Sequence, residues 1–68
     1  MDFSILKTIR KSKNITLKEM SNKTGKSIAY ISLVERNKKT PPLSLIEDIC
    51  KELGVIELLL VIKSEHYK

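Results

Sequence analysis

The sequence predicts an all-α protein in which five short helices form one domain. Apolar side chains recur at steps of three and four residues, which is the spacing of one face of a helix. Residues that start or stop helices separate these segments. The length of 68 residues allows one small domain, so we assign residues 1–68 to it. A domain of this size buries only about 60% of its unfolded surface, which favours self-association.

The composition excludes several classes of protein. With 41% hydrophobic and 31% charged residues, the chain is typical of a globular protein and not of a disordered one. Its single cysteine, Cys50, and single histidine, His66, exclude an intramolecular disulfide and leave too few groups for a metal centre or a catalytic site. We therefore expect no enzymatic activity, no metal, no cofactor and no small-molecule ligand.

Neither a membrane span nor a signal peptide is predicted. The longest apolar run, residues 58–62, is far too short to cross a bilayer. The first ten residues lack the charged and then apolar layout of a signal peptide. We expect a cytoplasmic protein.

Positive charge is concentrated in the first part of the chain. Residues 1–39 carry ten basic and three acidic side chains, a net charge of +7, whereas residues 40–68 carry three basic and five acidic ones, a net charge of −2. Such asymmetry is the electrostatic footprint of a nucleic-acid-binding protein. On charge alone, a lysine-rich face that only keeps the protein soluble and an anionic membrane surface are the alternatives.

The first two helices are predicted at residues 3–12 and 16–23. The first carries an apolar stripe made of Ile5, Leu6 and Ile9. The second begins with a capping box, in which the Thr16 hydroxyl and the Glu19 carboxylate each bond an amide that the helix leaves unpaired. Gly25 ends it, because glycine readily adopts the left-handed backbone of a tight turn.

The third and fourth helices are predicted at residues 28–36 and 43–53. Ser27 precedes the third helix and is a favourable N-cap. The two prolines at positions 41–42 interrupt the helical pattern and then allow a new helix to start, because proline suits only the first turn. Gly54 is expected to cap the fourth helix in a left-handed conformation.

The last predicted helix, residues 55–66, is apolar at seven of the eight positions from 55 to 62. A helix that is apolar nearly all round must bury both faces, and four short helices can cover only one of them. We therefore predict a twofold homodimer through this helix. The residues predicted to pack across the axis are Ile56, Leu59, Leu60 and Ile62. Completion of the monomer core by the same residues, and a strand pairing across the dimer, are the alternatives.

A helix, a tight turn at Gly25 and a second short helix make a helix-turn-helix at residues 16–36. Further residues accompany it, namely Ile9-Arg10, the run of residues 30–37, Pro41 and Leu53-Gly54-Val55. Together these residues resemble the Xre and lambda-repressor-like family of bacterial and phage regulators, with the resemblance covering residues 3–60. It implies a compact five-helix, lambda-repressor-like DNA-binding domain.

The resemblance also implies roles for particular residues. In the family, the Arg that ends the first helix pairs with the Glu that ends the recognition helix, which here implies a structural salt bridge between Arg10 and Glu35. The recognition helix of family members lies in the major groove of double-stranded DNA. The implied base and groove contacts are Ser27, Ile28, Ala29, Tyr30, Ser32 and Leu33. The implied phosphate contacts are Thr16, Lys18, Lys26, Arg36, Asn37, Lys38 and Lys39.

The expected reading surface departs from the family pattern. Where many relatives carry Gln or Arg to read bases or to grip phosphate, this chain has Leu17, Ile28, Ala29 and Leu33. Apolar side chains still contact the thymine methyl group, and DNA deformability adds indirect readout, so an A/T-rich site is expected. Alternatively, Ile28 and Leu33 belong to a protein-binding surface.

The resemblance thus implies a transcriptional regulator, specifically a repressor that binds a palindromic operator as a homodimer. A phage or mobile-element repressor and a controller protein of a restriction-modification system both fit, and an antagonist protein is a candidate further partner. The alternative from another class is a protein-interaction module, such as an antitoxin or antirepressor. Cys50 is interpreted as a buried core thiol. His66 and Tyr67 are interpreted as a solvated tail or as the edge of the dimer.

Overall fold

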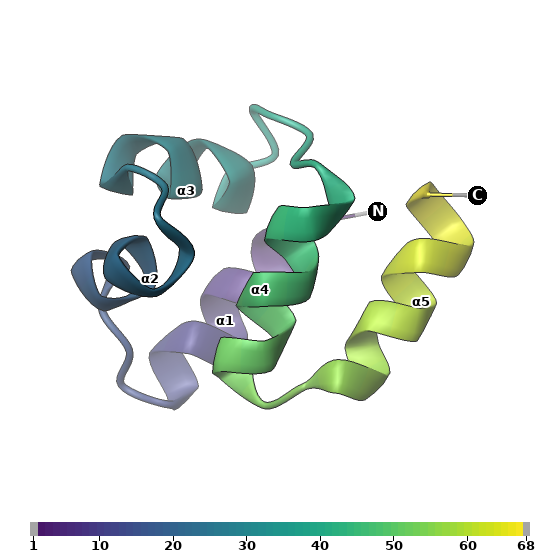
Figure 1. The fold of residues 1–68 in the computed structure, drawn as a ribbon, viewed down its shortest axis with the longest axis horizontal. Helices are drawn as coiled ribbons and strands as arrows, with labels where there is room; N and C mark the ends of the chain where they lie inside the picture. The colour runs from purple at the N-terminus through teal and green to yellow at the C-terminus, as the bar shows by residue number, and fades with distance from the viewer. Residues whose placement is uncertain (1, 68) are drawn as a thin grey trace.

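The computed structural model describes residues 2–67, with His66 described through its backbone alone. Within these residues the protein is all-α, as the sequence predicts, and contains five helices and no strand. The helices are α1 (Ser4–Ser12), α2 (Leu17–Thr24), α3 (Ile28–Glu35), α4 (Leu43–Leu53) and α5 (Ile56–His66). Helices α2 and α3 lie at one end of the molecule, α5 lies at the other, and α1 and α4 lie between them (Figure 1).

Local signals set most of the helix boundaries. The Thr16–Glu19 capping box forms at the start of α2, and the Ser27 hydroxyl accepts a hydrogen bond from the amide of Tyr30 at the start of α3. Gly25 and Gly54 follow α2 and α4 with φ of 74° and 70°. These angles lie in the left-handed region that glycine tolerates at a helix C-cap.

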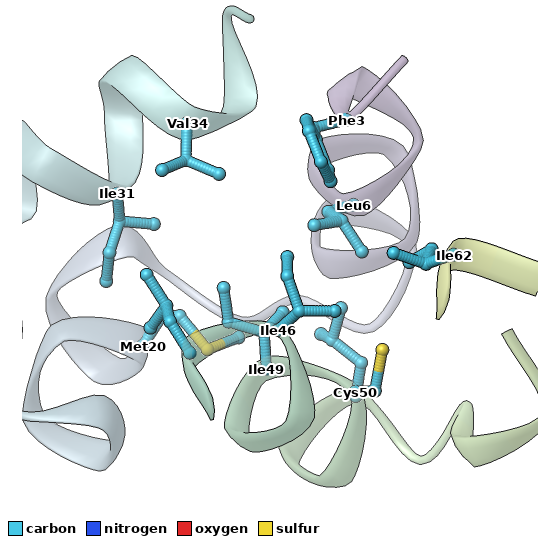
Figure 2. Close-up of a cluster of buried hydrophobic side chains, with 11 residues drawn as sticks. Phe3, Leu6, Met20, Ile31, Val34, Ile46, Ile49, Cys50 and Ile62 are labelled. Carbon is cyan, nitrogen blue, oxygen red and sulfur yellow. The ribbon is translucent and has the colours of Figure 1, made fainter. Parts of the chain in front are cut away.

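The core lies where α1 to α4 converge, and Ile62 of α5 is buried in it (Figure 2). Its buried hydrophobic residues are Phe3, Leu6, Met20, Ile31, Val34, Leu45, Ile46, Ile49, Cys50, Leu53 and Ile62. Cys50 is buried, as predicted. Burial first, and then the negative charge of Glu57, raise the pKa of the Cys50 thiol, so that it behaves as a small apolar side chain. The predicted stripe of α1 is narrower than expected, because Ile5 is 42% exposed.

The prediction that Ile62 packs across a dimer axis is wrong. Its side chain is 0% exposed and points into the monomer core near Leu6 (Figure 2). Two residues later along a helix the side chain has turned by about 200°, so Ile62 and Leu60 face opposite directions. Leu60 is 69% exposed, and Leu59 is partly buried against the core. The helix therefore divides its apolar residues between the core and the outer surface.

The interpretation of Tyr67 as part of a solvated tail is also wrong, whereas its interpretation as the edge of a dimer stays a prediction. Its ring packs against the core, and its hydroxyl donates a hydrogen bond to the carbonyl oxygen of Pro41, 26 positions earlier in the chain. The same interpretation of the His66 side chain lies outside the described residues.

Candidate nucleic-acid interface

Helix α3 is anchored by one face and leaves the other outside the core. Ile31 and Val34 are fully buried against the other helices. On the outer side, Ile28 is 44% exposed and Ser27 keeps its hydroxyl in the N-cap bond. The remaining predicted groove residues are exposed or half-buried, namely Ala29, Tyr30, Ser32 and Leu33. The residues predicted to read bases thus share a helix whose outer face is accessible.

The turn between α2 and α3 is closed by side chains of α2. The Ser21 hydroxyl donates to the carbonyl oxygen of Lys26, and the Thr24 hydroxyl accepts from the Lys26 amide at 3.3 Å. These bonds hold the backbone of the turn, whereas the Lys26 side chain is exposed. The position of α3 relative to α2 is therefore determined by packing and by hydrogen bonds inside the turn.

A buried ion pair fixes the other end of α3. Arg10 Nε donates to Glu35 Oε2 at 2.8 Å, and Arg10 Nη2 donates to Glu35 Oε1 at 3.1 Å. Arg10 Nη1 also donates to the carbonyl oxygen of Ile15 at 2.7 Å. Both charged residues are only 5% exposed, and such a bidentate pair has a defined geometry. The guanidinium therefore ties α1 and the loop before α2 to the end of α3, which is the arrangement expected from the resemblance.

The residues predicted to contact phosphate are all exposed, and most of them lie next to the ends of α3. Lys26 lies before its first turn, and Arg36, Lys38 and Lys39 follow its last turn. Lys18 lies in the first turn of α2, where backbone amides point outward. Cations therefore lie at both ends of α3.

Thr16 uses its polar groups within the capping box. Its amide and its hydroxyl both donate to Glu19 Oε1 at 3.1 Å, and its hydroxyl oxygen accepts from the Glu19 amide at 3.1 Å. The first-turn amides outside this box are those of Leu17 and Lys18. A phosphate at this helix end would meet those amides and not the Thr16 hydroxyl, and it would also meet the Glu19 charge.

Asn37 has a structural role that sequence reasoning missed. Its φ of 59° is left-handed, a conformation that Asn tolerates better than most residues. Its Oδ1 accepts from the Phe3 amide at 2.8 Å, and its Nδ2 donates to Asp2 Oδ1 at 2.6 Å. The Asn37 side chain therefore holds the segment before α1. An Asn directly after a helix is the signal that indicates a left-handed cap, but no local pattern reveals its contact with residues 2–3.

Lys39 and Tyr30 form a contact that joins two predicted groups of DNA-binding residues. The Lys39 Nζ atom lies 5.5 Å from the centroid of the Tyr30 ring, which is within the range of a cation–π interaction. A predicted groove residue and a predicted phosphate residue thus belong to one continuous surface.

The model of the helix-turn-helix family matches residues 6–59. The chain belongs to the helix-turn-helix family. The predicted resemblance to Xre and lambda-repressor-like regulators is thereby confirmed, and this membership supports a DNA-binding regulator. No curated protein and no solved structure matches the chain significantly.

The family match includes the helices that carry the surface around α3. It covers nearly all of α1 to α4 and only the beginning of α5. Residues 60–66 of α5, which include the exposed Leu60, lie outside the residues that the family model matches.

The described residues show no sign of a site of another kind. They contain no group of three or more His, Cys, Asp or Glu side chains suited to a metal ion and no pocket. None of their helices is long and apolar enough to cross a membrane. The family match directs attention instead to the surface around α3, the second helix of the helix-turn-helix.

Proposed function

We propose that this helix-turn-helix protein is a sequence-specific transcriptional repressor that binds a palindromic operator as a homodimer. Helix α3 would enter the major groove, as recognition helices of this architecture do. The observation that carries the proposal is the accessible outer face of α3 between cations at both of its ends. Ion-pair and turn contacts hold this helix in place, so that phosphate contacts can set its register on DNA.

The outer face of α3 supports recognition of an A/T-rich site. Ile28 and Ala29 are exposed and Leu33 is partly exposed, so apolar groups are available for the methyl group of thymine. Ser32 supplies a hydroxyl on this face that can bond either kind of base edge. Because few hydrogen-bonding groups are present, deformability of the DNA would contribute much of the specificity.

A second copy of the chain would bind to the outer face of α5. Ile56 and Val61 are exposed and flank Leu60 there, and a cluster of apolar side chains on a small helical surface favours a protein partner. The Leu59 side chain is partly exposed and adds to this apolar surface. Because α5 and α3 lie toward opposite ends of the molecule (Figure 1), a copy docked on α5 would leave α3 uncovered. Two recognition helices about 34 Å apart would then address half-sites one helical turn apart.

A protein-interaction module, such as an antitoxin or antirepressor, is the second candidate function. The exposure of Ile28 favours it, because an apolar group on the outer face of α3 also suits a protein partner. In that case, α3 would bind protein, and the neighbouring lysines would contribute little to binding of DNA.

The double variant Lys38→Ala/Lys39→Ala tests the phosphate assignment. We expect its affinity for duplex DNA to fall by roughly an order of magnitude, to a similar extent for all DNA sequences. Each lost phosphate contact should reduce the slope of log K against log salt by about 0.9, so the slope should fall by about 2. The affinity can be measured by fluorescence anisotropy at several salt concentrations.

A matched control replaces two exposed lysines that lie on other helices. Lys7 and Lys51 lie on α1 and α4 and are exposed. Lys7→Ala/Lys51→Ala removes the same charge and should leave the slope close to that of the unaltered protein. Equal slopes for all three proteins would contradict the DNA-binding surface and favour the protein-interaction module.

A further inference from the structure

The loop between α3 and α4, residues 36–42, carries three of the cations proposed to contact phosphate. Hydrogen bonds connect this loop to both ends of the described chain, through the Asn37 side chain near its start and the Pro41 carbonyl oxygen near its end. Asn37 bonds residues 2 and 3, and Pro41 bonds Tyr67. We propose that Asn37 and Tyr67 are positioning residues, which brace this loop so that Lys38 and Lys39 meet the phosphates in a fixed arrangement. The inference rests on the proposed DNA-binding function.

The brace at the start of the loop is anchored in the core. Phe3, whose amide donates to Asn37 Oδ1 at 2.8 Å, is a buried core residue. Asp2 Oδ1 accepts from Asn37 Nδ2 at 2.6 Å and from the Ser4 amide at 2.9 Å. The Asn37 bond first, and then the Ser4 amide, lower the pKa of the Asp2 carboxyl to about 2, so the acceptor is charged at neutral pH. The loop is thus attached to a segment that the buried Phe3 side chain holds against the core.

The brace at the end of the loop comes from the residue that follows α5. Tyr67 packs its ring against the core, and Pro41 is fully buried, so the bond between the Tyr67 hydroxyl and the Pro41 carbonyl oxygen joins two groups that are both packed in the fold. Burial, and to a smaller extent the neighbouring Tyr30, raise the pKa of the Tyr67 hydroxyl. This hydroxyl therefore keeps its proton and acts as the donor at neutral pH.

Between the two braces the lysine side chains remain accessible. The Lys38 amide donates to the Leu33 carbonyl oxygen at 2.8 Å, which fixes its backbone, while the Lys38 and Lys39 side chains are exposed. Lys39 lies over the ring of Tyr30. A cation carried by an ordered backbone loses less conformational entropy when it binds phosphate than one carried by a mobile loop. The braces therefore favour DNA binding through the lysines whose backbone they position.

A double-mutant cycle distinguishes positioning from a general effect on the fold. Tyr67→Phe keeps the ring and removes the hydroxyl, and Asn37→Gly removes the side chain while tolerating the left-handed backbone. The affinity of each variant for a generic duplex is measured at one salt concentration, both with the lysines present and in the Lys38→Ala/Lys39→Ala background. We expect each substitution to weaken binding about three- to five-fold with the lysines present, and by less than two-fold without them.

The same fold-change in both backgrounds, or no change in either, would overturn the inference. Nuclear magnetic resonance relaxation of the Lys38 and Lys39 amides in the free protein supplies a second readout. Faster backbone motion in the two variants, confined to residues 36–42, is the expected result, and unchanged motion would contradict the brace. If the unaltered protein failed to bind duplex DNA, the proposed function would fail, and the relaxation data would still decide whether the brace exists.

Discussion

Replacing Arg10 by methionine is expected to destabilise the protein by about 3–5 kcal/mol, because it leaves the Glu35 carboxylate buried without its partner. The carboxylate now receives two hydrogen bonds from the guanidinium, and the substitution removes both. A domain of this size has a total stability of roughly 3–10 kcal/mol. The variant should therefore be partly or wholly unfolded at room temperature. Urea unfolding followed by circular dichroism measures the change.

Two further variants show whether the buried charge is the cause. Arg10→Met/Glu35→Leu removes both charges and should recover much of the lost stability, because an apolar pair of similar volume can replace a buried ion pair. Lys7→Met introduces the same side chain at an exposed position of α1 and should change stability by less than about 0.5 kcal/mol. A double variant as unstable as Arg10→Met alone would contradict this account of the ion pair.

Replacing Leu60 by lysine is expected to dissociate the proposed homodimer without unfolding the monomer. Each copy would lose a buried leucine at the interface, worth about 1.5–3 kcal/mol. Because both copies carry the substitution, the dimer dissociation constant should rise by a factor of more than about 100. Light scattering at tens of micromolar protein measures the change in mass, and the affinity for a palindromic duplex should fall with it.

Ile62→Ala is the matched control for the Leu60 variant, because it changes the same helix on its buried side. It should lower stability by about 2–5 kcal/mol, whereas Leu60→Lys should leave the unfolding free energy of the monomer nearly unchanged. A monomeric mass for the unaltered protein would contradict the proposed dimer. A Leu60 variant that stayed dimeric would contradict this interface.

Much of the fold was predictable because the signals that define the helices are local. The capping box at Thr16, the N-cap at Ser27 and the glycines at 25 and 54 act within a few residues of themselves. The observed helices therefore begin and end within about one residue of the predicted bounds. The pairing of Arg10 with Glu35, 25 positions apart, was expected only because the chain resembles a family in which that pair recurs.

The division of α5 between core and surface was not predictable from its pattern. When seven of eight successive residues are apolar, the periodicity that would distinguish an inner face from an outer one is missing. The choice of Ile62 for the core depends on how α5 packs against α1 and α4. The contacts of Asn37 and Tyr67 were missed for a related reason, since each joins residues 26 or more positions apart.

Selection of bound duplexes from a random-sequence pool at near-physiological salt shows whether the protein reads a DNA sequence as a dimer. We expect enrichment of an A/T-rich inverted repeat whose half-site centres lie about one helical turn apart. If the protein retains DNA in a salt-dependent way but enriches no sequence, sequence-specific binding is contradicted. Such a result would point to non-specific binding or to a protein partner for α3.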